Sequence, residues 1–294
     1  MPVSAPPPAP PSTAPPAAGP DQDAAGLARA DAAATAGAPR PAALVRTRGD
    51  RRSLEFRPGM IQSEMRLSRP DALVLRYARA MMCFVLYQPR PRQILMVGLG
   101  GGSLAKFCHR HLPQAHITVI ELRADVIALR EQFLIPPDDS RFRIVHGDAA
   151  HYMVHLRNSV DVILVDGFDA SGMPAALGSA RFYADCRTAL RPGGVLVANL
   201  FSYDRQYGAM LARLRRTFAD RVSWFNGIAG NNRILFAVKA AGADAAASAD
   251  AAAARALRMH RLVTWRRRLG CAFLNRWLAH WLVLRISRQG QAPR

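Results

Sequence analysis

The regular alternation of two kinds of segment is the feature that most constrains how this sequence can fold. Between residues 94 and 200, short apolar runs of strand length alternate with longer segments that have helical spacing. The expected strands are 94–97, 117–121, 143–146, 160–165 and 195–200, and the helices between them include 103–111 and 124–133. Strands separated by helices of this length form a parallel sheet with helices on both faces. The sequence therefore predicts an α/β fold.

The last two strands are expected to depart from the parallel arrangement. Residues 204–218 have the spacing of a further helix, and residues 221–225 and 233–238 then follow as strands with a Gly/Asn-rich connection between them. Because this connection is too short for a helical crossover, the two strands should be antiparallel neighbours. Five parallel strands finished by an antiparallel pair are typical of the class I S-adenosylmethionine-dependent methyltransferase-like (Rossmann-like) sheet.

The segments on either side of this sheet differ from it in composition. Residues 1–41 are dominated by Ala and Pro without a hydrophobic period, which predicts a disordered tail. Residues 42–92 should form a small region with a β-hairpin at 53–65 and a packing helix at 72–87. The remaining predicted boundaries are 93–239 for the sheet domain, 240–254 for an Ala-rich linker and 255–294 for a basic amphipathic helical segment.

Cysteine usage and hydropathy exclude several classes of protein. The cysteines are Cys83, Cys108, Cys186 and Cys271; they form no CxxC pair, and the histidines have no ligand spacing. Neither a metal site nor a disulfide framework is expected, and the thiols should be reduced and mostly buried. The chain has no apolar run long enough to span a bilayer and no secretory pattern in residues 1–20, so we expect a cytoplasmic protein.

Glycines and acids follow three successive strands. The run GLGGGS at 98–103 comes directly after the first strand, where glycines let the backbone turn tightly and approach a ligand closely. Glu121 ends the second strand, where a carboxylate can accept both hydroxyls of a ribose, and Asp148 ends the third, where it can accept from the amine of adenine. These strand ends meet at one crevice, which predicts an adenosyl site, the alternative being a tight turn with solvated acids. The predicted cofactor-binding residues are Gly98, Gly100, Gly101, Glu121, Asp148 and Ala149.

Two further carboxylates stand at the end of the fourth strand. Asp166 and Asp169 occur in the run DVILVDGFD, where the reactive sulfonium of an adenosyl cofactor is expected. An amine that attacks a sulfonium must lose a proton, and a neighbouring carboxylate can hold the cation and receive that proton. We predict Asp166 as this catalytic base and Asp169 as a ligand for the substrate cation. The alternative for Asp169 is a helix N-cap.

Taken together, these motifs resemble the spermidine/spermine synthase family, the polyamine aminopropyltransferases. The resemblance covers about residues 53–239, and its most specific part is the DxxD element followed by Arg181-Phe182-Tyr183 and a Pro-Gly-Gly turn. It implies transfer of an aminopropyl group from decarboxylated S-adenosylmethionine to a small amine, with Asp166 as base and Asp169 as polyamine ligand. It also implies that Gln62 and Tyr77 bind substrate and that the protein forms a homodimer.

The sequence departs from the family pattern at three places. Gly101 stands where the family has an Asp that holds the amino group of the decarboxylated cofactor, Arg79 stands where it has a Glu, and the Tyr-Pro-rich substrate loop is missing. The formal charge of +19 should also repel a polyamine unless the local field is reversed. Loss of the loop Asp relieves repulsion of a carboxylate. The alternative functions are therefore methyl transfer from S-adenosylmethionine, and non-catalytic nucleoside binding by a protein that acts through its basic tail.

That tail allows more than one interpretation. Residues 251–294 hold ten Arg and no Asp or Glu, and thus supply +10 of the +19. Tryptophans and leucines lie between these arginines, a pattern that suits contact with an anionic membrane surface or with nucleic acid. The alternative is a helix packed on the enzyme or on a second subunit.

Overall fold

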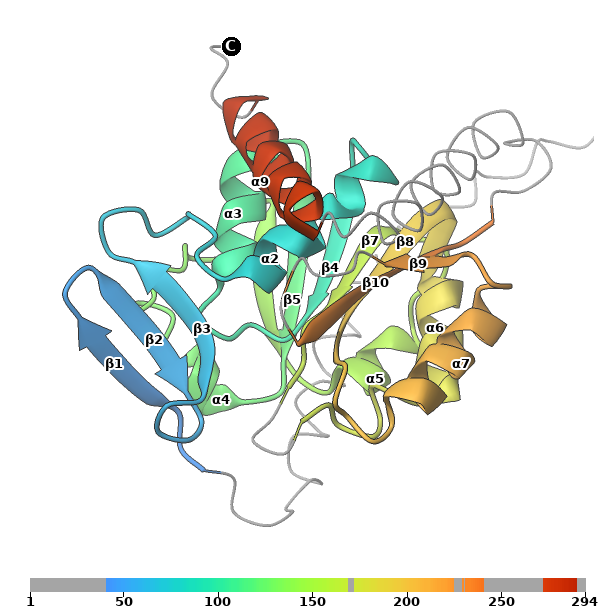
Figure 1. Ribbon diagram of the computed structural model, residues 1–294, viewed down its shortest axis with the longest axis horizontal. Coiled ribbons are helices and arrows are strands. Elements are labelled where there is room, and N and C mark those ends of the chain that lie inside the picture. Colours follow the sequence, from blue (N-terminus) through green and yellow to red (C-terminus); the bar gives the residue numbers. More distant parts are fainter. Residues whose placement is uncertain (1–40, 169–171, 225–228, 230, 241–271, 290–294) are drawn as a thin grey trace, which may run out of the picture.

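The computed structural model describes residues 41–168, 172–224, 229, 231–240 and 272–289. All but the last residue of the predicted tail at 1–41, and all but the first residue of the predicted linker at 240–254, lie outside the described residues. Within them, a small antiparallel sheet packs beside a larger mixed sheet that carries helices on both faces (Figure 1).

The larger sheet has seven strands in the order β6-β5-β4-β7-β8-β10-β9. They are β4 (Gln93–Val97), β5 (His116–Glu121), β6 (Phe142–His146), β7 (Val160–Val165), β8 (Leu190–Phe201), β9 (Val222–Trp224) and β10 (Asn232–Val238). Strands β4 to β8 pair in parallel, whereas β10 is antiparallel to both β8 and β9. The predicted fold class and the predicted antiparallel pair are confirmed.

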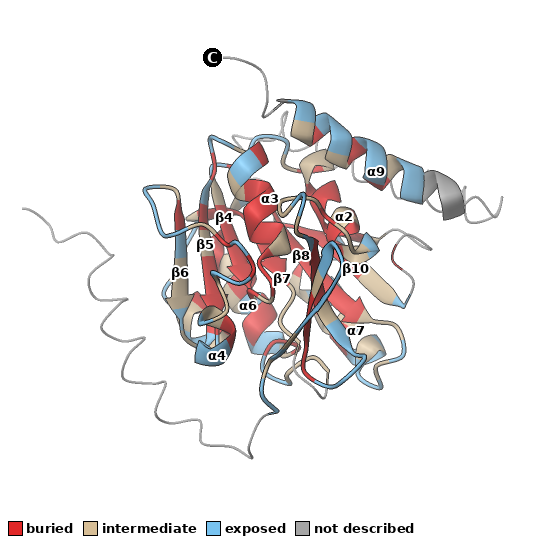
Figure 2. Ribbon diagram, turned by 90° about the vertical axis from the view of Figure 1, so that its left-hand side faces the viewer, coloured by how far each residue is buried: buried red, intermediate tan, exposed pale blue. Residues whose placement is uncertain are grey.

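Helices cover the two faces of this sheet because successive strand residues point to opposite sides. Ile94 and Met96 face a core that α2, η1, α3 and α9 cover, whereas Leu95 and Val97 face a second core that α5, α6 and α7 cover. The bounds are α2 (Arg76–Met81), η1 (Met82–Leu86), α3 (Ser103–His111), α4 (Ala124–Ile127), α5 (Ala149–Met153), α6 (Ala180–Ala189), α7 (Tyr207–Thr217) and α9 (Ala272–Gln289). Figure 2 shows the buried sheet between these layers.

Two predicted helices are shorter than expected. The helix predicted at 124–133 ends at Ile127, and turns with bonds such as Leu129 N to Val126 O continue to Leu134, which has a positive φ of 52°. The helix predicted at 72–87 begins only at Arg76 and tightens into the 3₁₀ helix η1. In both segments the apolar spacing is real, but turns bury the same side chains as a longer α-helix would.

The small sheet contains the predicted hairpin and one additional strand. Strands β2 (Arg51–Glu55) and β3 (Ile61–Arg66) form the hairpin, and β1 (Leu44–Arg48) pairs with β2 in antiparallel orientation. The Gly59 amide donates to Oε2 of Glu55 at 2.7 Å, which closes the connection between β2 and β3. This sheet lies beside the C-terminal ends of the parallel strands and brings residues 60–63 to a cavity there (Figure 1).

A buried lysine connects the small sheet to α3. Lys106 is 5% exposed, and its Nζ donates to the main-chain oxygen of Phe133 at 2.6 Å and lies 3.2 Å from Sδ of Met65 on β3. Burial lowers the pKa of Lys106 from 10.5 to about 8, although Asp71 acts in the opposite direction. Lys106 therefore fixes Phe133 between α3 and the small sheet.

The cysteines in the described residues are free and buried, as predicted. Cys83, Cys108 and Cys186 form no disulfide, and burial raises the pKa of Cys83 and of Cys108 to about 12. Cys271 lies outside the described residues. Within the part of the chain that the structure describes, no helix has the length and apolar character needed to cross a membrane.

Replacing Lys106 by Met should change how stability depends on pH. Between about pH 8 and pH 10.5 the unfolded chain still holds the Lys106 proton that the folded chain has released, so the free energy of unfolding should rise with pH in that interval. In Lys106→Met this rise in the free energy of unfolding should be absent, because Met has no proton to release. Urea unfolding of parent and variant at a series of pH values measures the difference. If the free energy of unfolding depends on pH in the same way for both proteins, the assigned effect of burial on Lys106 is wrong.

Candidate functional site

A cavity of about 600 Å³ lies at the C-terminal ends of the parallel strands. Loops that follow β4 to β8 supply one side of it, and β3 and the start of α2 supply the other. Most of the predicted site residues line this cavity, namely Gln62, Tyr77, Gly98, Gly100, Glu121, Asp148, Ala149 and Asp166. Residues from both the small sheet and the larger sheet are thus brought together.

The glycine loop allows two strand ends to approach each other. Gly98 has a φ of 93°, and a Cβ at this position would lie 2.5 Å from the main-chain oxygen of Asp166. Gly100, with a φ of 51°, also has a conformation that residues with a side chain rarely adopt. The loop backbone therefore lies directly beside the end of β7, without side chains between them.

Glu121 holds the glycine loop in place from the end of β5. Its Oε2 accepts from the Leu99 amide at 2.7 Å, and its Oε1 accepts from the Arg123 amide at 2.9 Å. The side chain is 8% exposed, and burial raises the pKa of Glu121 despite these hydrogen bonds, which act in the opposite direction. The Gly100 amide is a third donor near this carboxylate, which still has acceptor capacity left for a ligand hydroxyl.

Asp148 lies at the rim of the same cavity and begins α5. As N-cap of that helix it accepts from the Ala150 amide through Oδ1 at 2.7 Å, while Ala149 beside it is buried. Asp148 thus has the capping role that is typical of Asp and is also an exposed residue that lines the cavity.

Asp166 occupies the end of β7, where it is half-buried among polar side chains. Nδ2 of Asn199 on β8 donates to its Oδ1 at 2.8 Å, and Nδ2 of Asn232 on β10 donates to Oδ1 of Asn199 at 2.9 Å. The Tyr77 hydroxyl from α2 lies within hydrogen-bond reach of the Asp166 carboxylate and 3.3 Å from the main-chain oxygen of Gln62. Burial raises the pKa of Asp166, and the bonds from Asn199 and Tyr77 act against that shift.

Asn199 was not among the predicted site residues, although the sequence contained a signal for it. It is the single polar side chain in the otherwise apolar run 195–201 of β8, and it is 1% exposed. A buried polar group needs a hydrogen-bond partner, so a lone Asn in such a run indicates a carboxylate or amide nearby.

An aromatic row leads outward from Asp166. Phe168 and Phe201 have ring centroids 4.4 Å apart, and Phe201 stacks on Tyr203 at 5.1 Å with an interplanar angle of 11°. All three rings line the cavity, and Tyr203 is 67% exposed at its outer end. Such rings can bind an ammonium group through their faces.

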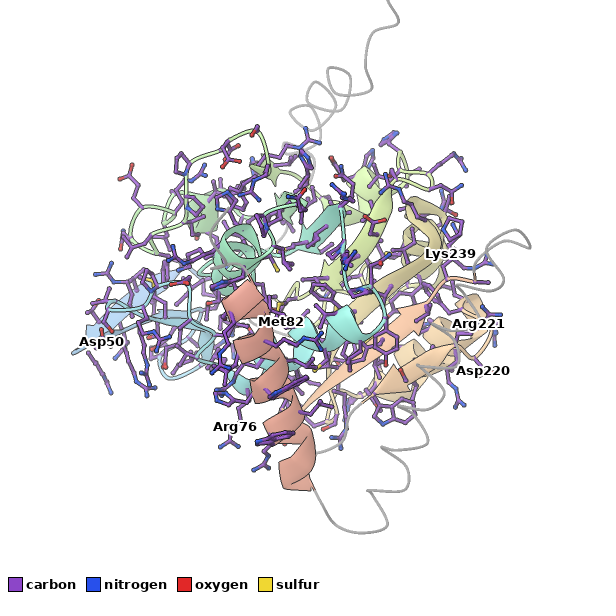
Figure 3. All side chains as sticks on the ribbon, turned by 90° about the horizontal axis from the view of Figure 1, so that it is seen from above. Asp50, Arg76, Met82, Asp220, Arg221 and Lys239 are labelled. Atoms are coloured by element: carbon purple, nitrogen blue, oxygen red, sulfur yellow. The ribbon has the colours of Figure 1, made fainter. Side chains whose placement is uncertain are left out.

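Two positions singled out in the sequence lie away from the cavity, and a third is not described. Gly101 does not line the cavity, and a Cβ there would meet Cδ1 of Phe133 at 2.7 Å and Oγ of Ser63 at 2.8 Å. Arg79 also lies off the cavity, where its Nη2 donates to the main-chain oxygen of Val74 at 3.2 Å. Asp169 lies outside the described residues. Arg76, labelled in Figure 3, is the arginine of α2 that lines the cavity.

The titratable groups of the cavity do not form a metal site. Among the described residues, no three His, Cys, Asp or Glu side chains are grouped closely enough to hold a metal ion. The carboxylates of the cavity instead lie at the ends of separate strands, where each one is fixed by amide donors.

A family model and curated relatives that are similar to this chain indicate the same family, and a solved structure shares its fold. Residues 75–208 match the family model described as the spermine/spermidine synthase domain. A polyamine aminopropyltransferase from Chromobacterium violaceum is 42% identical over 183 residues, which cover 62% of this chain and 70% of the relative. One from Neisseria meningitidis is 40% identical over 176 residues, covering 59% and 67%. A probable spermidine synthase from Corynebacterium glutamicum has the same fold, with a TM-score of 0.59 at 24% identity over 67% of this chain and 76% of that one.

Replacing Gly98 by Ala should destabilise the fold, because the new Cβ would collide with the Asp166 carbonyl and the positive φ would be strained. Strain of this kind costs about 1–3 kcal/mol. The matched control is Gly208→Ala on α7, where no atom lies within 4 Å of the added Cβ; it should raise stability by about 0.5–1 kcal/mol. Urea unfolding of both variants and of the parent measures the effect. A Gly98→Ala variant as stable as the parent would contradict the close approach of β4 and β7.

Proposed function

This chain belongs to the spermine/spermidine synthase family of transferases, and we propose that it moves an aminopropyl group from decarboxylated S-adenosylmethionine to an amine, with Asp166 as general base. The observation that carries the proposal is the half-buried Asp166 carboxylate, which lies in one cavity with the glycine loop, Glu121 and Asp148. This arrangement combines acceptors for a nucleoside with a base for an attacking amine.

The residues at the ends of β4, β5 and β6 fit the nucleoside of this cofactor. The amide bonds that Glu121 accepts orient its carboxylate, so that its remaining lone pairs can accept from the two ribose hydroxyls. Asp148 uses Oδ1 for its helix and leaves Oδ2 to accept from the amine of adenine. Gly98 and Gly100 permit close approach of the backbone, since neither has a Cβ between the loop and a ligand.

Asp166 is placed to take a proton at the other end of the cavity. When bound, the cofactor supplies an electrophilic carbon next to a positively charged sulfur. As the amine nitrogen bonds to that carbon and the carbon–sulfur bond breaks, Asp166 receives the proton that the nitrogen loses. Burial raises the pKa of Asp166, which makes this carboxylate a stronger base than an exposed one. The amide of Asn199 keeps the carboxylate oriented through Oδ1.

The amine substrate is expected to extend along the aromatic row. Phe168, Phe201 and Tyr203 continue outward from Asp166 and offer ring faces to a cationic chain. Gln62 and Tyr77 from the small sheet and α2 close the opposite side. We further propose that Asp169, which follows directly after Phe168 in the sequence, binds the distal ammonium group.

The environment of Gly101 favours a second candidate cofactor. Phe133 and Ser63 occupy the space that a side chain at position 101 would need, so that part of the loop is neutral. A neutral loop does not repel the carboxylate of ordinary S-adenosylmethionine, and methyl transfer is therefore the second candidate reaction.

Three carboxylates in the cavity, Glu121, Asp148 and Asp166, nevertheless favour the decarboxylated cofactor, because it adds no further negative charge.

Asp166→Asn should lower the rate of product formation by about 10²–10⁴-fold while cofactor binding stays nearly unchanged, because the amide cannot take the proton but can still accept from Asn199. Mass spectrometry of the products with putrescine as acceptor measures the rate, and calorimetry measures binding. Asp185→Asn, which affects a surface ion pair with Arg181, is the control and should be fully active. A variant at position 166 that is as active as the parent would show that the base is wrongly assigned.

The two candidate cofactors can be separated by their affinities. We expect calorimetry to show that decarboxylated S-adenosylmethionine binds at least tenfold more tightly than S-adenosylmethionine, a difference of about 1.4 kcal/mol. Tighter binding of the carboxylated form would contradict aminopropyl transfer and favour methyl transfer.

A further inference from the structure

Helix α9 packs on the enzyme through one face. It lies against α2, η1 and α3, and Figure 3 looks down on it with Met82 of η1 beside it. Ala279, Leu282 and Ile286 are buried in the core that also contains α2 and α3. None of the described residues of α9 lines the cavity. The interpretation of the basic tail as a helix packed on the enzyme therefore accounts for the inner face of α9. It does not account for the opposite face.

The opposite face of α9 is exposed to solvent (Figure 2), yet it carries large apolar side chains. Trp277, Trp281 and Leu284 are 60%, 41% and 42% exposed. Their spacing of four and three residues places them within about 60° of one another around the helix. Large apolar side chains that gather on one outward face, opposite the face that packs on the core, are typical of a surface with a partner.

Positive charge accompanies this outward face. Arg276, Arg285 and Arg288 are exposed, and the sequence of α9 contains no Asp or Glu. Cζ of Arg285 lies 5.6 Å from the ring centroid of Trp281. The partner of such a face should therefore be apolar in part and negatively charged. A second copy of the same face does not meet this requirement, because its arginines would repel those of the first.

We propose that this outward face of α9 binds the surface of a membrane that contains anionic lipids. Tryptophan prefers the boundary between headgroups and acyl chains because its ring is apolar and its N–H is polar. Arginines beside the tryptophans reach the phosphate groups, and Leu284 enters the apolar layer. The helix then lies in the plane of the surface, with its inner face still packed on α2 and α3.

The arrangement of the tryptophans favours lipid over nucleic acid. Trp277 and Trp281 have ring centroids 6.4 Å apart and an interplanar angle of 17°, and Arg285 follows Trp281 by one helical turn. Trp277 and Arg285 thus flank the ring of Trp281, which leaves less open face there for a stacking partner. A nucleobase needs an open ring face to stack on. Insertion of the ring edges into a lipid layer needs no such face.

Co-sedimentation of the full chain with vesicles tests this proposal. The parent should bind vesicles of phosphatidylcholine with 30% phosphatidylglycerol at least tenfold more tightly than vesicles of phosphatidylcholine alone, with an affinity that falls as salt is raised. The double variant Trp277→Ser/Trp281→Ser should lose at least tenfold in affinity for the anionic vesicles. The matched control Val154→Ser removes an exposed apolar group at the end of α5 and should bind like the parent.

Other outcomes would overturn the proposal. If the double variant binds anionic vesicles as tightly as the parent, the outward face of α9 is not the membrane contact. If the same change instead abolishes binding to a single-stranded RNA, or converts a dimer to a monomer in sedimentation equilibrium, the partner is a nucleic acid or a second copy. The thermal unfolding midpoint of each variant shows that the fold is retained, since both tryptophans point away from the core.

Discussion

The close approach of β4 and β7 at their C-terminal ends determines the geometry of the cavity. Because Gly98 has no Cβ, its backbone can lie against the carbonyl of Asp166, and this contact fixes the glycine loop relative to the Asp166 side chain. Glu121 then holds the loop from the other side through the Leu99 amide. The glycine-loop end and the Asp166 end of the cavity therefore have a fixed relation that is set by two neighbouring strands of the sheet.

The carboxylates at the two ends of β7 have different roles, which depend on their hydrogen-bond donors and burial. Asp161 at the start of β7 accepts from the amides of Arg92 and Gln93 and from Arg191, so its charge is fully used within the fold. Asp166 at the other end of the same strand has two neutral side-chain donors, the Asn199 amide and the Tyr77 hydroxyl, and faces the cavity. An ionised carboxylate with few donors in a buried place has a raised pKa, and it gains most from a cationic ligand. The difference in donors thus separates a structural acid from a chemically available one.

Strand ends could be predicted from the sequence, but contacts across the molecule could not. Gly98, Glu121 and Asp166 follow apolar runs directly, so their position at the sheet edge comes from the alternation alone. The placement of Gln62 beside Tyr77 depends on how the small sheet packs, and only a family resemblance indicated it. Strand β1 was missed because four of its five residues are exposed and it therefore lacks an apolar pattern. The length of the helix after Glu121 was overestimated because the turns beyond Ile127 bury the same apolar positions.

The distribution of charge resolves the conflict between a strongly basic chain and a cationic substrate. Residues 251–294 supply +10 of the total of +19, and the part of this segment that the structure describes lies in α9, away from the cavity. Exposed charges farther apart than about 8 Å are largely screened at physiological ionic strength. Two arginines, Arg76 and Arg123, also line the cavity, and Arg123 is paired with Asp125. The three carboxylates that face the ligand space, Glu121, Asp148 and Asp166, outnumber them. An amine that enters the cavity therefore meets a local field set by these carboxylates, while the distant arginines remain available for an anionic surface.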